Sequence, residues 1–123
     1  TPPDEFLHLY DVLQRAQREQ VNACLPGTPA EEIDRIGREI ITGEGYGQYF
    51  IHRTGHGIGV EAHEEPYIVE GNKIPVTSGN VFSVEPGIYI PDKWGARIED
   101  IVAVTDHEPH SLNTVDHNLA VHG

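Results

Sequence analysis

The sequence predicts an α+β fold in which two helices cover one face of an antiparallel sheet. Two observations predict this class. Apolar residues recur at helical spacing through the first third of the chain, and short β-prone runs separated by glycine and proline follow from residue 48 onward. The chain has 123 residues, 37% of them apolar, which suits one domain with a modest core.

The first predicted helix covers residues 5–25, a stretch without internal proline or glycine. Pro26 and Gly27 end it. A second helix is expected to start near Pro29, since proline is favoured in the first turn, and to stop near Gly43, where further glycines follow. Its buried stripe consists of isoleucines at helical spacing: Ile33, Ile36, Ile40 and Ile41.

The β-rich part is expected over residues 48–105, after the helical part at about 5–43. Its candidate strands are Tyr67–Glu70, Asn80–Val84, Gly87–Ile90 and Arg97–Val104. Residues 106–123 have no clear period, so they are expected to be either a poorly ordered tail or a docked edge strand. Five histidines without a motif are interpreted as surface residues: His8, His107, His110, His117 and His122.

The charge balance excludes several kinds of partner. Twenty acidic and eight basic residues give a formal charge of −12, which repels phosphate backbones and anionic lipid. No apolar stretch is long enough for a membrane helix, and no secretory leader is recognisable. The lone Cys24 cannot form an internal disulfide. We therefore expect a cytoplasmic protein that binds neither nucleic acid nor membranes.

The first chemical feature is a histidine cluster, formed by His52, His56 and His63 within twelve residues. Glycines at positions 55, 57 and 59 argue against a helix here, and hence against a zinc site built from two histidines one helical turn apart. The same glycines allow the backbone to approach a ligand or metal closely.

Two glutamates form the second feature. Glu85 ends an apolar run, and Glu99 stands at the start of a β-branched run, on the same face as Arg97 by alternation. A buried carboxylate needs a cation, a metal or hydrogen-bond donors. Taken alone, Glu99 is explained equally well as the partner of Arg97 in an ordinary ion pair. Together with His56, however, the two glutamates predict a site assembled from three segments.

The ordered set of motifs resembles the pita-bread (creatinase/aminopeptidase) metallopeptidases, a family that includes methionine aminopeptidases, Xaa-Pro aminopeptidases and prolidases. The motifs are His56-Gly57-Ile58-Gly59, His63-Glu64, Glu85-Pro86-Gly87 and Arg97-Ile98-Glu99-Asp100. His52, Arg97 and the run from Glu85 to Tyr89 resemble the proline-peptidase branch. Ala62 departs from the pattern, in which a β-branched residue is usual.

The resemblance implies that residues 1–123 form the C-terminal part of a catalytic domain with a dinuclear metal site. His56, Glu85 and Glu99 would be metal ligands, with Glu99 bridging two ions; Mn²⁺ is expected first, and Co²⁺ or Zn²⁺ also suit these donors. Glu85 would act as the general base and His63 as the donor to the oxyanion. The substrate, a peptide with proline at its second position, would be positioned by His52, His63, Tyr89 and Arg97.

The resemblance also implies two further ligands, aspartates from an upstream Asp-x-Gly … Ser-Asp-x-Thr-Arg region that this sequence lacks. Asp4, Asp11 and Asp34 do not have that motif around them. We therefore expect a fragment that carries three of five ligands, binds metal weakly or not at all, and is inactive alone. Strand edges exposed in such a fragment predict a homodimer or a strand-exchanged oligomer.

Three alternatives remain open from the sequence. Aminopeptidase and dipeptidase activities are not separated by these motifs. The chain is alternatively a non-catalytic relative that binds peptides or proteins, although its intact set of site residues argues against this. An unrelated single-metal β-fold, such as a cupin-like module, would not require the two glutamate motifs.

Overall fold

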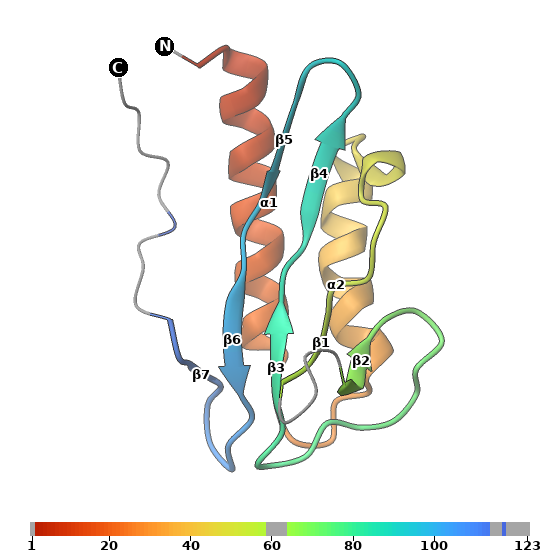
Figure 1. The fold of residues 1–123 in the computed structure, drawn as a ribbon, viewed down its shortest axis with the longest axis vertical. Helices are drawn as coiled ribbons and strands as arrows, with labels where there is room; N and C mark the ends of the chain where they lie inside the picture. The colour runs from red at the N-terminus through yellow and green to blue at the C-terminus, as the bar shows by residue number, and fades with distance from the viewer. Residues whose placement is uncertain (1, 59–63, 114–116, 118–123) are drawn as a thin grey trace.

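The computed structural model describes residues 2–58, 64–113 and 117. Helices α1 (Asp4–Asn22) and α2 (Ala30–Gly43) lie side by side on one face of the strands (Figure 1). A short 3₁₀ turn, η1 (Gly47–Tyr49), follows. The strands are β1 (Gly55–Gly57), β2 (Glu64–Ile68), β3 (Val81–Val84), β4 (Gly87–Ile90), β5 (Trp94–Arg97), β6 (Asp100–Ala103) and β7 (His110–Ser111). The predicted α+β fold is confirmed.

The strands form two antiparallel sheets. Five of them have the order β2-β1-β3-β6-β7, and β4 pairs separately with β5. The prediction of one strand over residues 97–104 is wrong, because β5 ends at Arg97 and β6 begins at Asp100. The break lies beside Pro86, which has no N–H to continue a ladder; its carbonyl accepts from the N–H of Ile98 at 3.3 Å.

The other predicted boundaries differ by a few residues. The first helix ends at Asn22 because the chain turns there, with the N–H of Cys24 bonded to the carbonyl of Val21. The strand expected at Tyr67–Glu70 lies earlier, at β2. β7 pairs with β6, so this part of the C-terminal segment is a docked edge strand. Neither described helix has the length and apolar character needed to cross a bilayer.

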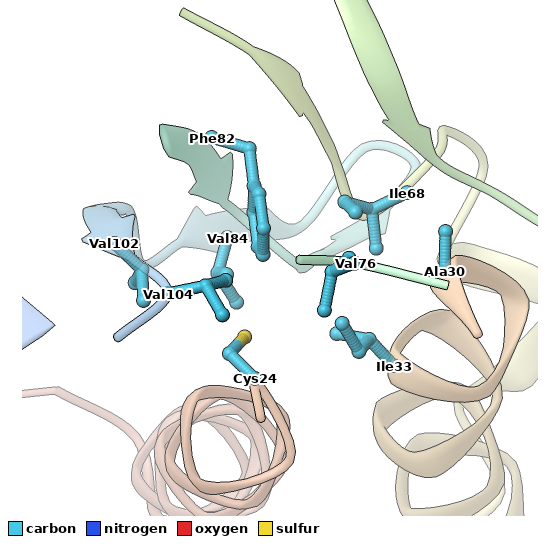
Figure 2. Close-up of a cluster of buried hydrophobic side chains, with 9 residues drawn as sticks. All are labelled: Cys24, Ala30, Ile33, Ile68, Val76, Phe82, Val84, Val102 and Val104. Carbon is cyan, nitrogen blue, oxygen red and sulfur yellow. The ribbon is translucent and has the colours of Figure 1, made fainter. Parts of the chain in front are cut away.

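The core lies between the helices and the sheet, in two clusters. Figure 2 shows the first, in which Cys24 and Ile33 from the helical part meet Phe82, Val84 and Val102 of the central strands. The second cluster packs α1 and α2 against β4 and the segment before β6. Its fully buried or nearly buried members are Leu9, Val12, Leu13, Ala16, Ile41, Phe50, Ile88 and Ile98. Each large apolar side chain buried in this way stabilises the fold by roughly 1.5–3 kcal/mol. These contacts fix β3 and β6, on which the candidate site is built.

Candidate active site

The register of β3 and β6 brings the two motif glutamates together. The last pair of the ladder is Val84 opposite Asp100, so Glu85, which follows β3, lies beside Glu99, which precedes β6. Their side chains share a hydrogen bond. Two antiparallel strands that end at the same level therefore deliver both carboxylates to one place.

The two carboxyl groups have opposite pKa shifts. Burial alone would raise the pKa of Glu85. The interactions of its carboxylate with Glu99 and Ser83, and the nearby basic side chains of His56 and Arg97, instead lower this pKa below its ordinary value. The pKa of Glu99 is raised, first by the hydrogen bond to Glu85, then by burial and by the negative charge of Glu85. Two carboxylates this close disfavour each other's ionisation, so the pair favours a shared proton or a bound cation.

His56 approaches the same place from β1, which lies beside β3. Its backbone N–H donates to Ser83 Oγ at 3.1 Å, and its Nδ1 lies 3.1 Å from the carbonyl of Gly57. Because a carbonyl only accepts, Nδ1 carries the hydrogen in the neutral ring and Nε2 has the lone pair. Nε2 lies 3.8 Å from Glu85 Oε2.

Ser83 joins His56 to Glu85 and was not singled out from the sequence. It is fully buried, accepts from the His56 N–H, and hydrogen-bonds the Glu85 carboxylate. A signal was present, since Ser83 is the polar member of an otherwise apolar strand and stands two residues before Glu85, on the same face.

A second chain of contacts joins the predicted substrate-positioning residues. His52 Nδ1 lies 2.8 Å from the carbonyl of Arg53, so Nδ1 donates, and Nε2 accepts from the Tyr89 hydroxyl at 2.9 Å. The Arg97 guanidinium lies near the same hydroxyl and opposes the rise in its pKa. Burial raises the pKa of Tyr89, which keeps its hydroxyl protonated and able to donate.

These residues line one open cavity of 490 Å³, formed by His52, Arg53, His56, Glu85 and Arg97. Arg53 was not predicted; its guanidinium stacks over the Tyr67 ring at 4.8 Å. A larger cavity of 730 Å³ on the outer face of α2 contains none of the predicted site residues. The predicted oxyanion donor, His63, lies outside the described residues.

The donor set fits divalent ions. One imidazole and two carboxylates converge, and His56 donates its other ring N–H to a backbone carbonyl, as metal-bound histidines usually do. Within the described ranges, however, no group of three or more histidine, cysteine, aspartate or glutamate side chains is arranged so that it could hold a metal ion as it stands.

Fold and site together define the C-terminal part of a pita-bread metallopeptidase domain. The sequence profile of metallopeptidase family M24 matches residues 1–106, and the chain belongs to this family. The family assignment made from the motifs is thereby confirmed, and membership of a metallopeptidase family implies divalent metal ions.

Similar proteins include "Probable dipeptidase PepE" from Mycobacterium tuberculosis, 50% identical over 120 residues that make up 98% of this chain and 32% of that protein. "Xaa-Pro dipeptidase" from Lactobacillus helveticus is 47% identical over 121 residues, 98% of this chain and 33% of that protein. The crystal structure of dipeptidase PepE from Mycobacterium ulcerans superposes with a TM-score of 0.94 at 50% identity, over 97% of this chain and 32% of that one. The chain thus spans about a third of the length of these relatives.

One histidine interpreted as a surface residue is not one. His117 Nε2 lies 2.7 Å from Oδ2 of the buried Asp100, which also accepts from Gln17, and the His117 carbonyl accepts from Tyr10 and Gln14. The interpretation of His117 is therefore wrong, because Asp100 needs buried donors and α1 supplies contacts that hold the histidine there.

Proposed function

We propose that this chain is part of the catalytic domain of a dipeptidase that hydrolyses Xaa-Pro dipeptides with two divalent metal ions. The observation that carries the proposal is the meeting of His56 and Glu85 in the cavity that His52 and Arg97 also line, with Glu99 beside Glu85. The names of the similar proteins, which include a Xaa-Pro dipeptidase, support dipeptidase over aminopeptidase activity. Manganese suits the donors best, with cobalt or zinc as alternatives.

The reaction adds water across the bond between the first residue and proline. His56, Glu85 and Glu99 would hold the metal ions, which when bound would lower the pKa of water and polarise the scissile carbonyl. Glu85 Oε2 takes the proton from the attacking water and so acts as the general base. As the C–N bond breaks, Glu85 passes this proton to the proline nitrogen, which has no hydrogen of its own and needs one to leave.

The other residues bind and orient the substrate. His52 is held as the Nδ1–H tautomer by the carbonyl of Arg53 and by Tyr89, whose hydroxyl also lies near the Arg97 guanidinium. This arrangement fixes the substrate-facing groups before the substrate binds, which lowers the entropic cost of reaching the transition state. His63 is proposed as the donor to the developing oxyanion.

We also propose that residues 1–123 alone bind metal weakly and are inactive, because they supply three of the five ligands that the family resemblance implies. The exposed edges at β2 and β7, with Ile51, Ile74 and Leu112 on the surface, support a homodimer or a strand-exchanged oligomer. The free, buried Cys24 is compatible with the proposed reducing, cytoplasmic location.

The test is turnover of Ala-Pro by the full-length protein that contains this sequence, with added Mn²⁺. We expect hydrolysis that a chelator abolishes and that Glu85→Gln lowers at least about a hundredfold, since this variant loses the proton acceptor. Arg35→Gln, on the exposed face of α2, is the matched control and should retain wild-type rates. Binding of Ala-Pro without turnover by the wild type would instead favour the non-catalytic peptide-binding alternative.

A further inference from the structure

The segment from Phe50 to Thr54 carries His52 and leads into β1, yet the described structure has no helix or strand there. Backbone polar groups in such a segment must be satisfied by other means. Here the carbonyls of Phe50 and His52 accept from a side chain of α2, and the N–H of Thr54 donates to an α2 carboxylate as well as to the Ile68 carbonyl of β2. This dependence points to a role for two α2 residues, Asp34 and Arg38.

Arg38 binds the segment directly. Its Nη1 donates to the carbonyl of Phe50 at 2.9 Å, and its Nη2 donates to the carbonyl of His52 at 3.0 Å. The guanidinium also stacks 3.9 Å above the Phe50 ring, against whose edge the His52 ring packs. The planar fork of arginine makes both carbonyl contacts at once, which a lysine ammonium cannot do.

Asp34 orients Arg38 and holds the end of the segment. Its carboxylate is buried, accepts from Nε and Nη2 of Arg38 at 2.9 and 3.1 Å, and accepts from the hydroxyl of Thr54 at 2.7 Å. Gln20 of α1 donates to the same hydroxyl at 2.9 Å. Thr54 is therefore fixed by both helices.

Thr54 passes this constraint to the proposed proton acceptor. Its carbonyl accepts from the backbone N–H of Glu85 at 2.7 Å, at the point where β3 ends. Two residues after Thr54, His56 lines the cavity that contains His52 and Glu85. One ion pair on a helix, between the buried Asp34 and the partly exposed Arg38, thus connects to both the substrate-facing histidine and the catalytic glutamate.

We propose that Asp34 and Arg38 are positioning residues, in which Arg38 places His52 for substrate binding and Asp34, through Thr54, places Glu85 for proton transfer. An ion pair with one buried and one partly exposed partner is a weak source of stability, because desolvation and solvent screening offset much of its attraction, whereas its fixed geometry orders the groups around it. The functional part of this inference rests on the proposed dipeptidase activity.

Kinetics of the full-length protein on Ala-Pro test it. Arg38→Lys should raise KM about tenfold with kcat little changed, because one charge-assisted hydrogen bond to the His52 carbonyl is lost. Thr54→Val should instead lower kcat about tenfold, since the valine cannot bind Asp34. Thr54→Ser keeps the hydroxyl and should restore kcat to within about threefold. Thermal unfolding identifies any variant whose loss reflects unfolding alone.

A second measurement does not depend on activity. The ring nitrogens of His52, observed by NMR after ¹⁵N-histidine labelling and identified with His52→Gln, should report the Nδ1–H tautomer in the wild type. In Arg38→Lys they should report a mixture, and in the control Arg35→Lys they should be unchanged, because Arg35 bonds only to exposed glutamates among the described residues.

The outcomes are distinct. A wild-type protein that does not hydrolyse Ala-Pro overturns the proposed function, while the His52 spectra still decide the positioning role. Wild-type KM and an unchanged His52 spectrum in Arg38→Lys overturn the role of Arg38, as does an equal effect of Arg35→Lys. A Thr54→Ser variant as slow as Thr54→Val overturns the role of the hydroxyl.

Discussion

Gly55 leaves the least room for a side chain among the glycines whose surroundings the structure describes. It is buried in β1, directly before His56, and a Cβ built on it would lie 1.7 Å from the carbonyl oxygen of Ser83 in the adjacent strand. The obstacle is backbone and cannot rotate away. In Gly55→Ala, β1 and β3 must therefore separate by about 1.7 Å to restore an ordinary 3.4 Å contact.

We expect Gly55→Ala to lower the free energy of unfolding by about 3 kcal/mol, the upper part of the range for overpacked sites. With an unfolding entropy of roughly 2.1 cal/mol/K per residue over 123 residues, this lowers Tm by about 12 °C. The same separation moves His56 away from Glu85, so metal affinity of the full-length protein should also fall.

Thermal unfolding followed by far-UV circular dichroism measures the effect. Gly43→Ala is the matched control, since a Cβ at this last residue of α2 meets nothing within 4 Å and alanine favours helix. The control should be as stable as the wild type or slightly more so. If Gly55→Ala melts within about 2 °C of the wild type, the close approach of β1 and β3 described here is incorrect.

Three further predictions concern stability and assembly. Burial raises the pKa of the Cys24 thiol to about 12, so between pH 9 and pH 12 the thiol ionises only in the unfolded chain. The contribution of this thiol to the free energy of unfolding should be full below pH 9 and should fall by about 1.4 kcal/mol per pH unit from pH 9 to pH 12. Urea titrations at several pH values measure this fall, which the Cys24→Ala variant should lack. In the same assay, His117→Ala should lower the free energy of unfolding by about 1–3 kcal/mol, because Asp100 loses a buried donor. Substitution of the exposed His107 by alanine should leave the free energy of unfolding unchanged. Equal effects of the two substitutions would refute the contact between His117 and Asp100. Sedimentation velocity should show that the 123-residue chain forms oligomers. Leu112→Lys, a substitution next to the edge strand β7, should weaken this association. A monomer at all concentrations would exclude the proposed oligomers.

Much of the fold was predictable because its signals are local. The helical spacing of residues 5–25 and the β-prone run before Glu85 each depend on near neighbours in the sequence, and both elements appear within a few residues of their predicted bounds. The family, too, follows from short motifs in order. The break between β5 and β6 was missed, since alternation continues through Ile98 and Glu99 and only the pairing with Pro86 interrupts the ladder.

The contacts of the site were less predictable because they join distant segments. The pairing of Glu85 with Glu99 depends on strand register, which a single sequence does not give. The role of Asp34 depends on a partner twenty residues away, Thr54, and that of His117 depends on Asp100. A buried aspartate in a helix pattern was a usable signal, since such a carboxylate needs donors from elsewhere in the fold.

We propose that His56, Glu85 and Glu99 hold the metal of a peptidase centre. Anomalous diffraction from crystals of the full-length protein grown with Mn²⁺ tests this proposal most directly. Two anomalous peaks are expected, with His56 Nε2 and the carboxylate oxygens of Glu85 and Glu99 at coordination distances of roughly 2.0–2.5 Å. Peaks bound by other residues, or no peak in this cavity at saturating Mn²⁺, would contradict it.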